Sequence, residues 1–504
     1  MTWNWSALVL LLTAIGYLLP VIMLFIVPNN RKPSSATAWL LLIVLLPYLG
    51  LLIYLLIGSP KLPALRRAQQ HSADTLIATA VEEARARPDA RALLDPPITE
   101  RYTPFVALNT HLGGFPAFAG NSIELLPDYA GSLARITAEI DRAQHFVHVE
   151  YFIIARDAAT EACFVAMEAA AQRGVKVRVL LDQLGSSSYP HYKEMLAWMT
   201  AAGIEWHLML PVKFFSSRFT RPDLRNHRKI VVVDGAVGFV GSQNLIDRTY
   251  HKKKNLRKGL YYTELVARVT GPVVRQLNAI FMTDWYSETD VLLIDELTAE
   301  TGGAPIATGA VLCQALPSGP GFPDDNNLKL YSQLIHAANH TLTIANPYFV
   351  PDDALITAIT TAAQRGVDVT LISSEIGDQF LVYHAQRSYY EQLLRAGVKV
   401  YLYRSPILLH SKHLSVDDDI AVIGSSNMDL RSFTLNLEVT LVCYDREVVA
   451  AMQPVFASYL AREGAQPGGM GGAPDDDQAL REYLALDRRF TVRRYRRTAH
   501  LAPR

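Results

Sequence analysis

The chain has few cysteines and no excess of charge of either sign. Its three cysteines, Cys163, Cys313 and Cys443, lie far apart and match no metal-ligand spacing. Neither a disulfide framework nor a zinc site is therefore expected, and a reducing compartment is favoured. The 504 residues include 48 Lys plus Arg and 48 Asp plus Glu. This balance argues against a globally basic surface of the kind that most non-specific nucleic-acid binders use.

Charge is almost missing from residues 1–60, where Arg31 and Lys32 are the only charged side chains. Two apolar runs, Ala7–Val27 and Trp39–Ile57, fill most of this segment, and each is long enough to span a bilayer as a helix. The alternatives are a cleaved signal peptide and a buried core hairpin. A signal peptide needs a basic start, which Met1 to Ser6 do not provide. We therefore expect a transmembrane hairpin of two helices.

Basic residues beside the two runs predict how the hairpin is oriented. The connecting loop has Arg31 and Lys32, whereas the segment after the second run has Lys61, Arg66 and Arg67. Because cytoplasmic loops are enriched in Lys and Arg, this count favours a multi-pass protein with both termini, and the body that follows, in the cytoplasm.

An internal repeat organises the rest of the chain. In each half a short apolar run precedes a helical pattern, then a Val-rich strand, a second helix and another strand; the helices end before Gly174 and Gly203 or before Gly366 and Gly397. Strands that alternate with helices predict βαβ units. The expected fold is α/β, with two pseudo-symmetric lobes whose sheets are mixed and largely parallel, preceded by two transmembrane helices.

Composition divides the chain into five segments. Residues 463–504 combine a Gly-rich linker with an Arg-rich tail, which is either a solvated tail or a strip that rests on anionic lipid headgroups. The predicted segments are a hairpin (1–60), a helical connector (61–117), a first lobe (118–300), a second lobe (301–462) and the linker with its tail (463–504).

Both lobes contain the pattern H-x-K-x4-D followed by G-S-x-N, with the same offset of 14 residues from His to Gly. The strand period of two places His and Lys on one face, and the Asp falls at the turn of a hairpin. The residues are His227, Lys229, Asp234, Ser242 and Asn244 in the first lobe, and His410, Lys412, Asp417, Ser425 and Asn427 in the second.

This combination suits a phosphate group, because an ammonium and amide donors neutralise oxygens while an imidazole attacks or protonates. In-line displacement needs a second imidazole across the site, so we expect His227 and His410 to meet at an interface between the lobes. A metal site is the alternative, but a lysine two residues after each histidine would repel a cation. Asp234 and Asp417 either take part in the chemistry or fix their turns.

These motifs resemble those of the phospholipase D superfamily, from about Phe118 to Leu460. Together with the apolar hairpin and the segments FAGN, EYF and HSKHLSVDD, they resemble the bacterial cardiolipin synthases. The resemblance implies transfer of a phosphatidyl group between two phosphatidylglycerol molecules, giving cardiolipin and glycerol through a phosphatidyl-histidine. It assigns attack to His227 and acid-base work to His410, and it makes Glu264 and Glu438 candidates for the acids that orient the histidines.

The resemblance also implies a bacterial inner (plasma) membrane protein that needs no cofactor and no metal and binds no nucleic acid. Three alternatives stay open: a phospholipase D that hydrolyses the same intermediate, a nuclease, and an inactive lipid-binding scaffold. The basic run His251–Lys258 either gathers anionic headgroups or is a solvated loop. Nothing in the sequence indicates the oligomeric state.

Overall fold

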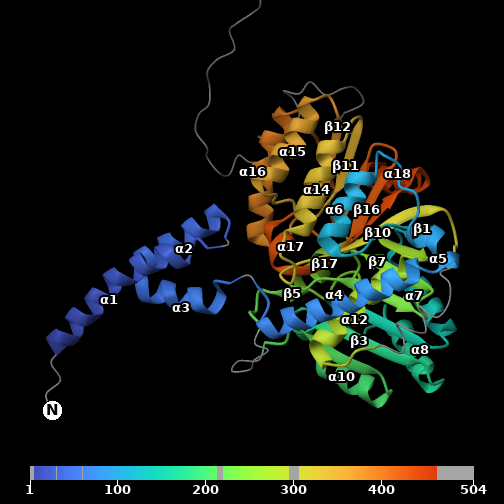
Figure 1. Cartoon of the computed structure of the whole chain (residues 1–504), viewed down its shortest axis with the longest axis horizontal. Helices are drawn as coiled ribbons and strands as arrows, with labels where there is room; N and C mark the ends of the chain where they lie inside the picture. Colours follow the sequence, from blue (N-terminus) through green and yellow to red (C-terminus); the bar gives the residue numbers. More distant parts are fainter. Residues whose placement is uncertain are drawn as a thin grey trace, which may run out of the picture.

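The computed structural model describes residues 5–29, 31–59, 61–212, 220–293, 306–403 and 405–461. Three apolar helices extend away from a body of two lobes, and in Figure 1 the second lobe (yellow to red) lies above the first (cyan to yellow-green). The predicted Gly-rich linker and Arg-rich tail lie outside the described residues.

The described residues before the first lobe form six helices. They are α1 (Trp5–Ile26), α2 (Pro33–Leu45), α3 (Pro47–Ile57), α4 (Ala64–Arg85), α5 (Pro88–Leu94) and α6 (Thr103–Gly113). Among the described helices, only α1 is both long and apolar enough to cross a membrane.

The second apolar run differs from the prediction of one spanning helix, since it divides into α2 and α3. Leu46 between them has φ −135° and ψ 72°. Proline disfavours the helical conformation in the residue before it and has no N–H to continue the hydrogen-bond ladder, so Pro47 ends one helix and begins the next.

The two lobes repeat one order of elements. The first lobe comprises β1 (Phe118–Leu126), α7 (Tyr129–Arg142), β2 (Phe146–Tyr151), α8 (Glu161–Gln172), β3 (Lys176–Asp182), α9 (Gln183–Ser187), α10 (Tyr192–Ala201), β4 (Glu205–Met209), β5 (Arg225–Asn226), β6 (Lys229–Val233), β7 (Val237–Gly241), α11 (Lys253–Lys258), β8 (Tyr261–Thr263), β9 (Val266–Thr270) and α12 (Val274–Thr289). The second comprises β10 (Val311–Ser318), α14 (Asn326–Ala337), β11 (Thr341–Ala345), α15 (Asp353–Gln364), β12 (Asp368–Ser374), α16 (Phe380–Arg395), β13 (Lys399–Tyr403), β14 (Ile407–Leu409), β15 (His413–Val416), β16 (Ile420–Gly424), α17 (Leu430–Thr434), β17 (Asn436–Tyr444) and α18 (Arg446–Ala461).

One mixed sheet runs through both lobes, in the order β13-β12-β11-β15-β16-β17-β10-β1-β9-β7-β6-β2-β3-β4. The two lobes mirror each other in this order, and β1 and β10 join them by antiparallel pairing. The mixed α/β fold is confirmed. The expectation of largely parallel sheets is wrong, because along this order only β2-β3-β4 and β11-β12-β13 pair in parallel. Helical crossovers connect those strands, whereas hairpins and the junction between lobes make the centre antiparallel.

Local sequence signals explain several of these boundaries. Gly174 and Gly366 follow α8 and α15 with φ of 89° and 93°, the left-handed conformation that commonly ends a helix. Asp234 and Gly235 have φ of 52° and 63°, as the turn of the β6-β7 hairpin requires.

The core is continuous across the two lobes. Ile230 of β6 and Ile423 of β16 belong to the same buried apolar cluster as Leu277 of α12 and Met452 of α18. Shared burial of this kind holds the lobes together, so a site between them is supported from both sides.

Candidate active site

Each lobe extends a short strand into the other, and these two strands precede the histidines. In the first lobe β5 pairs with β17 of the second, and in the second lobe β14 pairs with β8 of the first. His227 N then donates to Leu437 O at 2.8 Å, and His410 N donates to Thr263 O at 2.8 Å. Each histidine backbone is therefore fixed by the residue just before a glutamate of the opposite lobe.

The glutamate of one lobe holds the imidazole of the other. His227 Nδ1 lies 3.0 Å and 2.9 Å from the two carboxylate oxygens of Glu438, and His410 Nδ1 lies 2.7 Å from Glu264 Oε1. Burial by itself raises the pKa of both glutamates, but the neighbouring histidines and lysines outweigh it and lower each pKa below its ordinary value. Ionised carboxylates can only accept, so Nδ1 carries the proton in both rings and Nε2 is left for chemistry.

Hydroxyl and amide groups of the two G-S-x-N segments fix these glutamates. Ser425 Oγ donates to Glu438 Oε2 at 2.5 Å. On the other side, Asn244 Nδ2 donates to the hydroxyl of Tyr250 at 3.0 Å, and that hydroxyl donates to Glu264 Oε1 at 2.9 Å. The Asn244 amide is thus engaged with Tyr250, which differs from the expectation that it faces the phosphate.

The other two residues of these segments have unlike surroundings. Ser242 Oγ accepts from Leu265 N at 3.0 Å and so holds the residue after Glu264. The backbone N–H of Asn427 donates to Ser432 Oγ at 3.2 Å, and its buried Oδ1 has no hydrogen-bond partner among the described residues. Because that oxygen can only accept a hydrogen bond, it identifies no donor for a phosphate at Asn427.

The two lysines lie in the same buried cluster as the histidines. Lys229 Nζ donates to His227 O at 2.5 Å, and Lys412 Nζ donates to His410 O. Burial lowers the pKa of Lys229 to about 7 and that of Lys412 to about 8. Burial also lowers the pKa of His227 to about 4, and Lys412 of the other lobe contributes to this shift. A negatively charged phosphate would relieve the repulsion among these groups.

Aromatic rings enclose the two imidazoles unequally. The ring of Phe152 lies 5.1 Å from that of His227, while Tyr262 and Tyr348 lie 5.4 Å and 6.0 Å from His410. Asp378 accepts from both tyrosine hydroxyls, at 2.9 Å and 2.7 Å. His410 therefore has the more enclosed surroundings.

The basic run His251–Lys258 is partly helical, since α11 lies within it. Lys252, which precedes α11, forms an ion pair of 2.8 Å with Asp378 of the second lobe. The run thus contributes one cation, Lys252, to the groups around His410. The other four cations of the run are exposed and belong to α11: Lys253, Lys254, Arg257 and Lys258.

The aspartates of the two motifs contact backbone amides instead of the histidines or lysines. Asp234 accepts from the N–H groups of Gln144, His145 and Phe146 at 2.8 Å each. Asp417 accepts in the same way from residues 339–341 at the start of β11. These contacts favour the structural alternative for Asp234 and Asp417, because each carboxylate clamps the loop before the adjoining strand.

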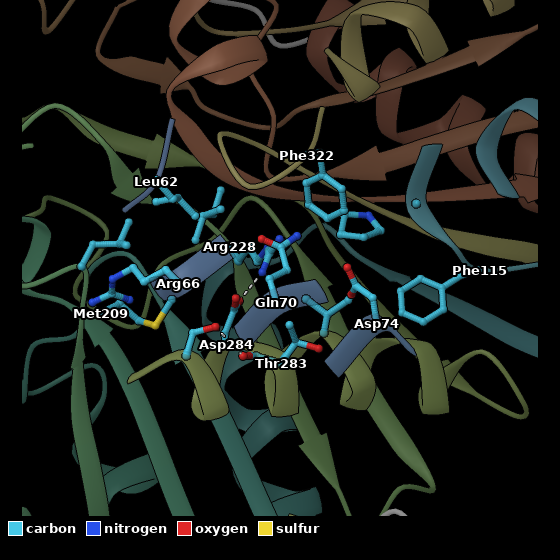
Figure 2. Close-up of a pocket in the computed structure, with 16 residues that line it drawn as sticks. Leu62, Arg66, Gln70, Asp74, Phe115, Met209, Arg228, Thr283, Asp284 and Phe322 are labelled. Carbon is cyan, nitrogen blue, oxygen red and sulfur yellow. Dashed lines mark hydrogen bonds and ion pairs between the residues drawn. The ribbon is translucent and has the colours of Figure 1, made fainter. Parts of the chain in front are cut away.

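Arg228 supports the site from the other face of the sheet. Its Nε donates to Glu438 O at 3.1 Å, and its guanidinium pairs with Asp284 of α12. Figure 2 shows this pair beside a small cavity of about 30 Å³, with Arg66, Gln70 and Asp74 of α4 around it. The helix that follows the apolar segment, α4, is thus packed behind the extended segment between β5 and β6 that bears His227.

Sequence reasoning found the motif residues and both glutamates but missed several neighbours. It did not identify Arg228 or Asp284, nor the role of Asp378 and Tyr348. The H-R-K triplet was a usable signal for Arg228, since a residue between two site residues of an extended segment points to the opposite face. Asp378 follows β12 and had no such signal.

Comparison with known proteins agrees with this geometry. Residues 136–285 and 331–460 match the family model described as "Cardiolipin synthase, PLD-like domain", and residues 5–59 match "Phospholipase_D-nuclease N-terminal". Proteins named Cardiolipin synthase A from Yersinia pseudotuberculosis serotype IB (strain PB1/+) and Yersinia pestis are each 34% identical over 467 residues, which cover 91% of this chain and 93% of theirs.

A solved structure shares the fold. The crystal structure of phosphatidylserine synthase from Haemophilus influenzae Rd KW20 matches with a TM-score of 0.54 at 16% identity, covering 78% of this chain and 98% of that one. The resemblance inferred from the two motifs is confirmed, and the chain belongs to the family of cardiolipin synthases with phospholipase D-like domains.

Proposed function

We propose that the chain is a cardiolipin synthase, which transfers a phosphatidyl group between two phosphatidylglycerol molecules and releases glycerol. One observation carries the proposal: two imidazoles, each oriented through Nδ1 by a carboxylate of the opposite lobe, share a buried cluster with two lysines. The two imidazoles can act as nucleophile and general acid in the exchange of one phosphodiester for another, and the two ammonium groups can balance the charge of the phosphate.

His227 is the proposed nucleophile. Because its pKa is lowered to about 4, chiefly by burial, its ring is neutral near pH 7 and Nε2 has a free lone pair. Nε2 forms the bond to phosphorus as the bond from phosphorus to the glycerol oxygen breaks. His410, protonated in the substrate complex, gives its proton to that oxygen, so that glycerol leaves and a phosphatidyl-His227 remains.

The second half of the reaction reverses these roles. His410, now neutral, takes the proton from the hydroxyl of a second phosphatidylglycerol as its oxygen attacks phosphorus. The bond between phosphorus and His227 Nε2 breaks, cardiolipin forms, and both histidines return to their starting states. Lys229 and Lys412 compensate the phosphate charge throughout, while Glu438 and Glu264 keep Nε2 of each ring directed at phosphorus.

The substrates fit a membrane protein. The exposed apolar surface of α1 supports a position of the chain at a bilayer, where phosphatidylglycerol and cardiolipin reside. We further propose that this is the bacterial inner (plasma) membrane and that the lobes lie on its cytoplasmic side.

Purified protein with headgroup-labelled phosphatidylglycerol in detergent tests the proposal. Formation of cardiolipin with an equal amount of free glycerol, abolished by His227→Ala, supports it. Phosphatidic acid as the main product would instead indicate a hydrolase. No turnover above that of His227→Ala would indicate a lipid-binding scaffold. Trapping the labelled intermediate and mapping the modified histidine tests the assignment of His227.

A further inference from the structure

The second apolar run leaves the catalytic body and returns to it. Lys32, at the start of α2, forms ion pairs with Asp325 at 2.9 Å and Asp352 at 3.3 Å, at the N-termini of α14 and α15. At the other end of the run, Arg221 of the first lobe donates to Ser59 O. Both ends of the α2-α3 segment are therefore held against the body, whereas a second spanning helix would place them on opposite faces of the bilayer.

The turn between α2 and α3 lies beside the middle of α1. Tyr48, at the start of α3, donates to Leu12 O, and a Cβ on Gly16 would lie 3.5 Å from the Tyr48 hydroxyl. At 1.5 Å per residue, the 22 residues of α1 extend about 33 Å, while α2 with 13 and α3 with 11 extend only about 20 Å and 17 Å. A hydrocarbon core is about 30 Å thick, so α1 can cross it and neither α2 nor α3 can.

Side-chain contacts show that α2 and α3 pack against each other as an antiparallel pair. The rings of Trp39 and Tyr54 meet edge to face at 5.4 Å. Nearer the turn, a Cβ on Gly50 would lie 2.9 Å from Ile43 Cα, so only glycine permits this approach. Figure 1 shows α2 running away from the body and α3 running back towards it beneath α2.

We propose that α1 alone crosses the bilayer and that α2 and α3 form a re-entrant wedge in the leaflet next to the catalytic body. The amino terminus then lies across the membrane from the lobes. In a two-span hairpin, the cations of the α1-α2 loop and those after α3 would lie on opposite sides of the bilayer. In this topology they all lie on the catalytic side: Arg31, Lys32, Lys61, Arg66 and Arg67. The positive-inside rule then assigns that side to the cytoplasm.

Single introduced cysteines can distinguish this topology from two spans. The three native cysteines are buried, so background labelling is low. The variants Ser6→Cys, Asn29→Cys and Ser59→Cys place thiols in the first turn of α1, between α1 and α2, and after α3, at exposed positions. A membrane-impermeant maleimide is applied to right-side-out bacterial spheroplasts that produce the full chain, before and after permeabilisation.

We expect Ser6→Cys to react in intact spheroplasts and the other two only after permeabilisation. Two spans would instead make Asn29→Cys react alone from outside, or protect it alone. Uniform labelling or uniform protection of the three would mean that α1 does not cross. Each of these other patterns overturns the proposal. Leu46→Cys, at the turn within the bilayer, is the matched control and should react slowly on either side.

Labelling is read independently of lipid synthesis. Transfer activity is measured on the same four variants, so a failure of the topology and a failure of the proposed function would be told apart. A variant that makes cardiolipin at the wild-type rate yet labels in the two-span pattern would refute the wedge and leave the enzyme assignment standing.

Discussion

Substitution of Glu438 by glutamine should slow the first chemical step although Glu438 lies in the lobe opposite His227. The change keeps the size of a fully buried side chain and removes the charge that both faces His227 Nδ1 and accepts from Ser425. A hydrogen bond to a charged group contributes about 1.5–3 kcal/mol. At 1.36 kcal/mol for each factor of ten, kcat/KM should fall about 10- to 150-fold.

The pH dependence should change in a predictable direction. Glu438 raises the pKa of Lys229, which burial lowers to about 7, so its loss should lower that pKa further. The ammonium is needed to bind phosphate and exists below this pKa. The loss of kcat/KM that follows deprotonation of Lys229 should therefore begin near pH 7 in the wild type and at lower pH in the variant, while the acid limb, set by His227 with a pKa of about 4, also moves down.

Glu264→Gln is the matched control, because it removes the corresponding carboxylate from His410. A phosphatidyl ester of p-nitrophenol needs little protonation of its leaving group, so this substrate should restore the release step in Glu264→Gln but not in Glu438→Gln. Release of p-nitrophenol is measured by absorbance, and the melting temperature checks that both variants fold. Restoration of Glu438→Gln alone would reverse the roles of the two histidines, and restoration of both would refute orientation of the nucleophile by Glu438.

Three further changes separate structural from chemical roles. Asp234→Ala removes acceptors from three backbone N–H groups, so it should lower the melting temperature while kcat of the folded protein stays within about tenfold of wild type; a lost kcat at unchanged stability would restore Asp234 to the chemistry. Asp284→Asn should cost about 3–5 kcal/mol in denaturant unfolding because it removes the carboxylate that pairs with the buried charge of Arg228, and adding Arg228→Met should recover most of that loss; a smaller cost would mean that the pair does not support the segment between β5 and β6. Burial lowers the pKa of His413 to about 3, so the unfolded chain takes up a proton below about pH 6.5 and the folded chain does not; stability should fall from pH 7 to 5, and less so in His413→Leu, as melting temperatures would show.

The two motif copies were enough to predict the duplicated α/β fold and the residues that gather at its centre. A repeat of one strand-helix pattern implies two equivalent lobes, and identical chemistry in both implies a shared site. The turn-forming Asp-Gly pair and the glycines after helices were readable because they act through local backbone conformation, which the sequence determines within a few residues.

Contacts between side chains of different lobes could not be predicted from local sequence. Glu438 and Glu264 were recognised as candidates, but their exchange between lobes depends on β5 and β14 reaching into the opposite lobe. The same limit explains why the sheet was expected to be largely parallel: the antiparallel junction of β1 and β10 is a contact of residues about 190 positions apart.

The apolar segment, residues 1–60, shows most clearly which properties the sequence determines and which depend on tertiary packing. Composition alone determined that residues 1–60 avoid water, because apolar side chains without charge have no stable place on an aqueous surface. Whether the second run crosses or returns depended on packing: Pro47 breaks the helix, Gly50 admits close contact with Ile43, and Lys32 pairs with carboxylates of the second lobe. Hydrophobicity is a property of each residue, whereas the path of the chain is set by contacts between residues that only the folded structure brings together.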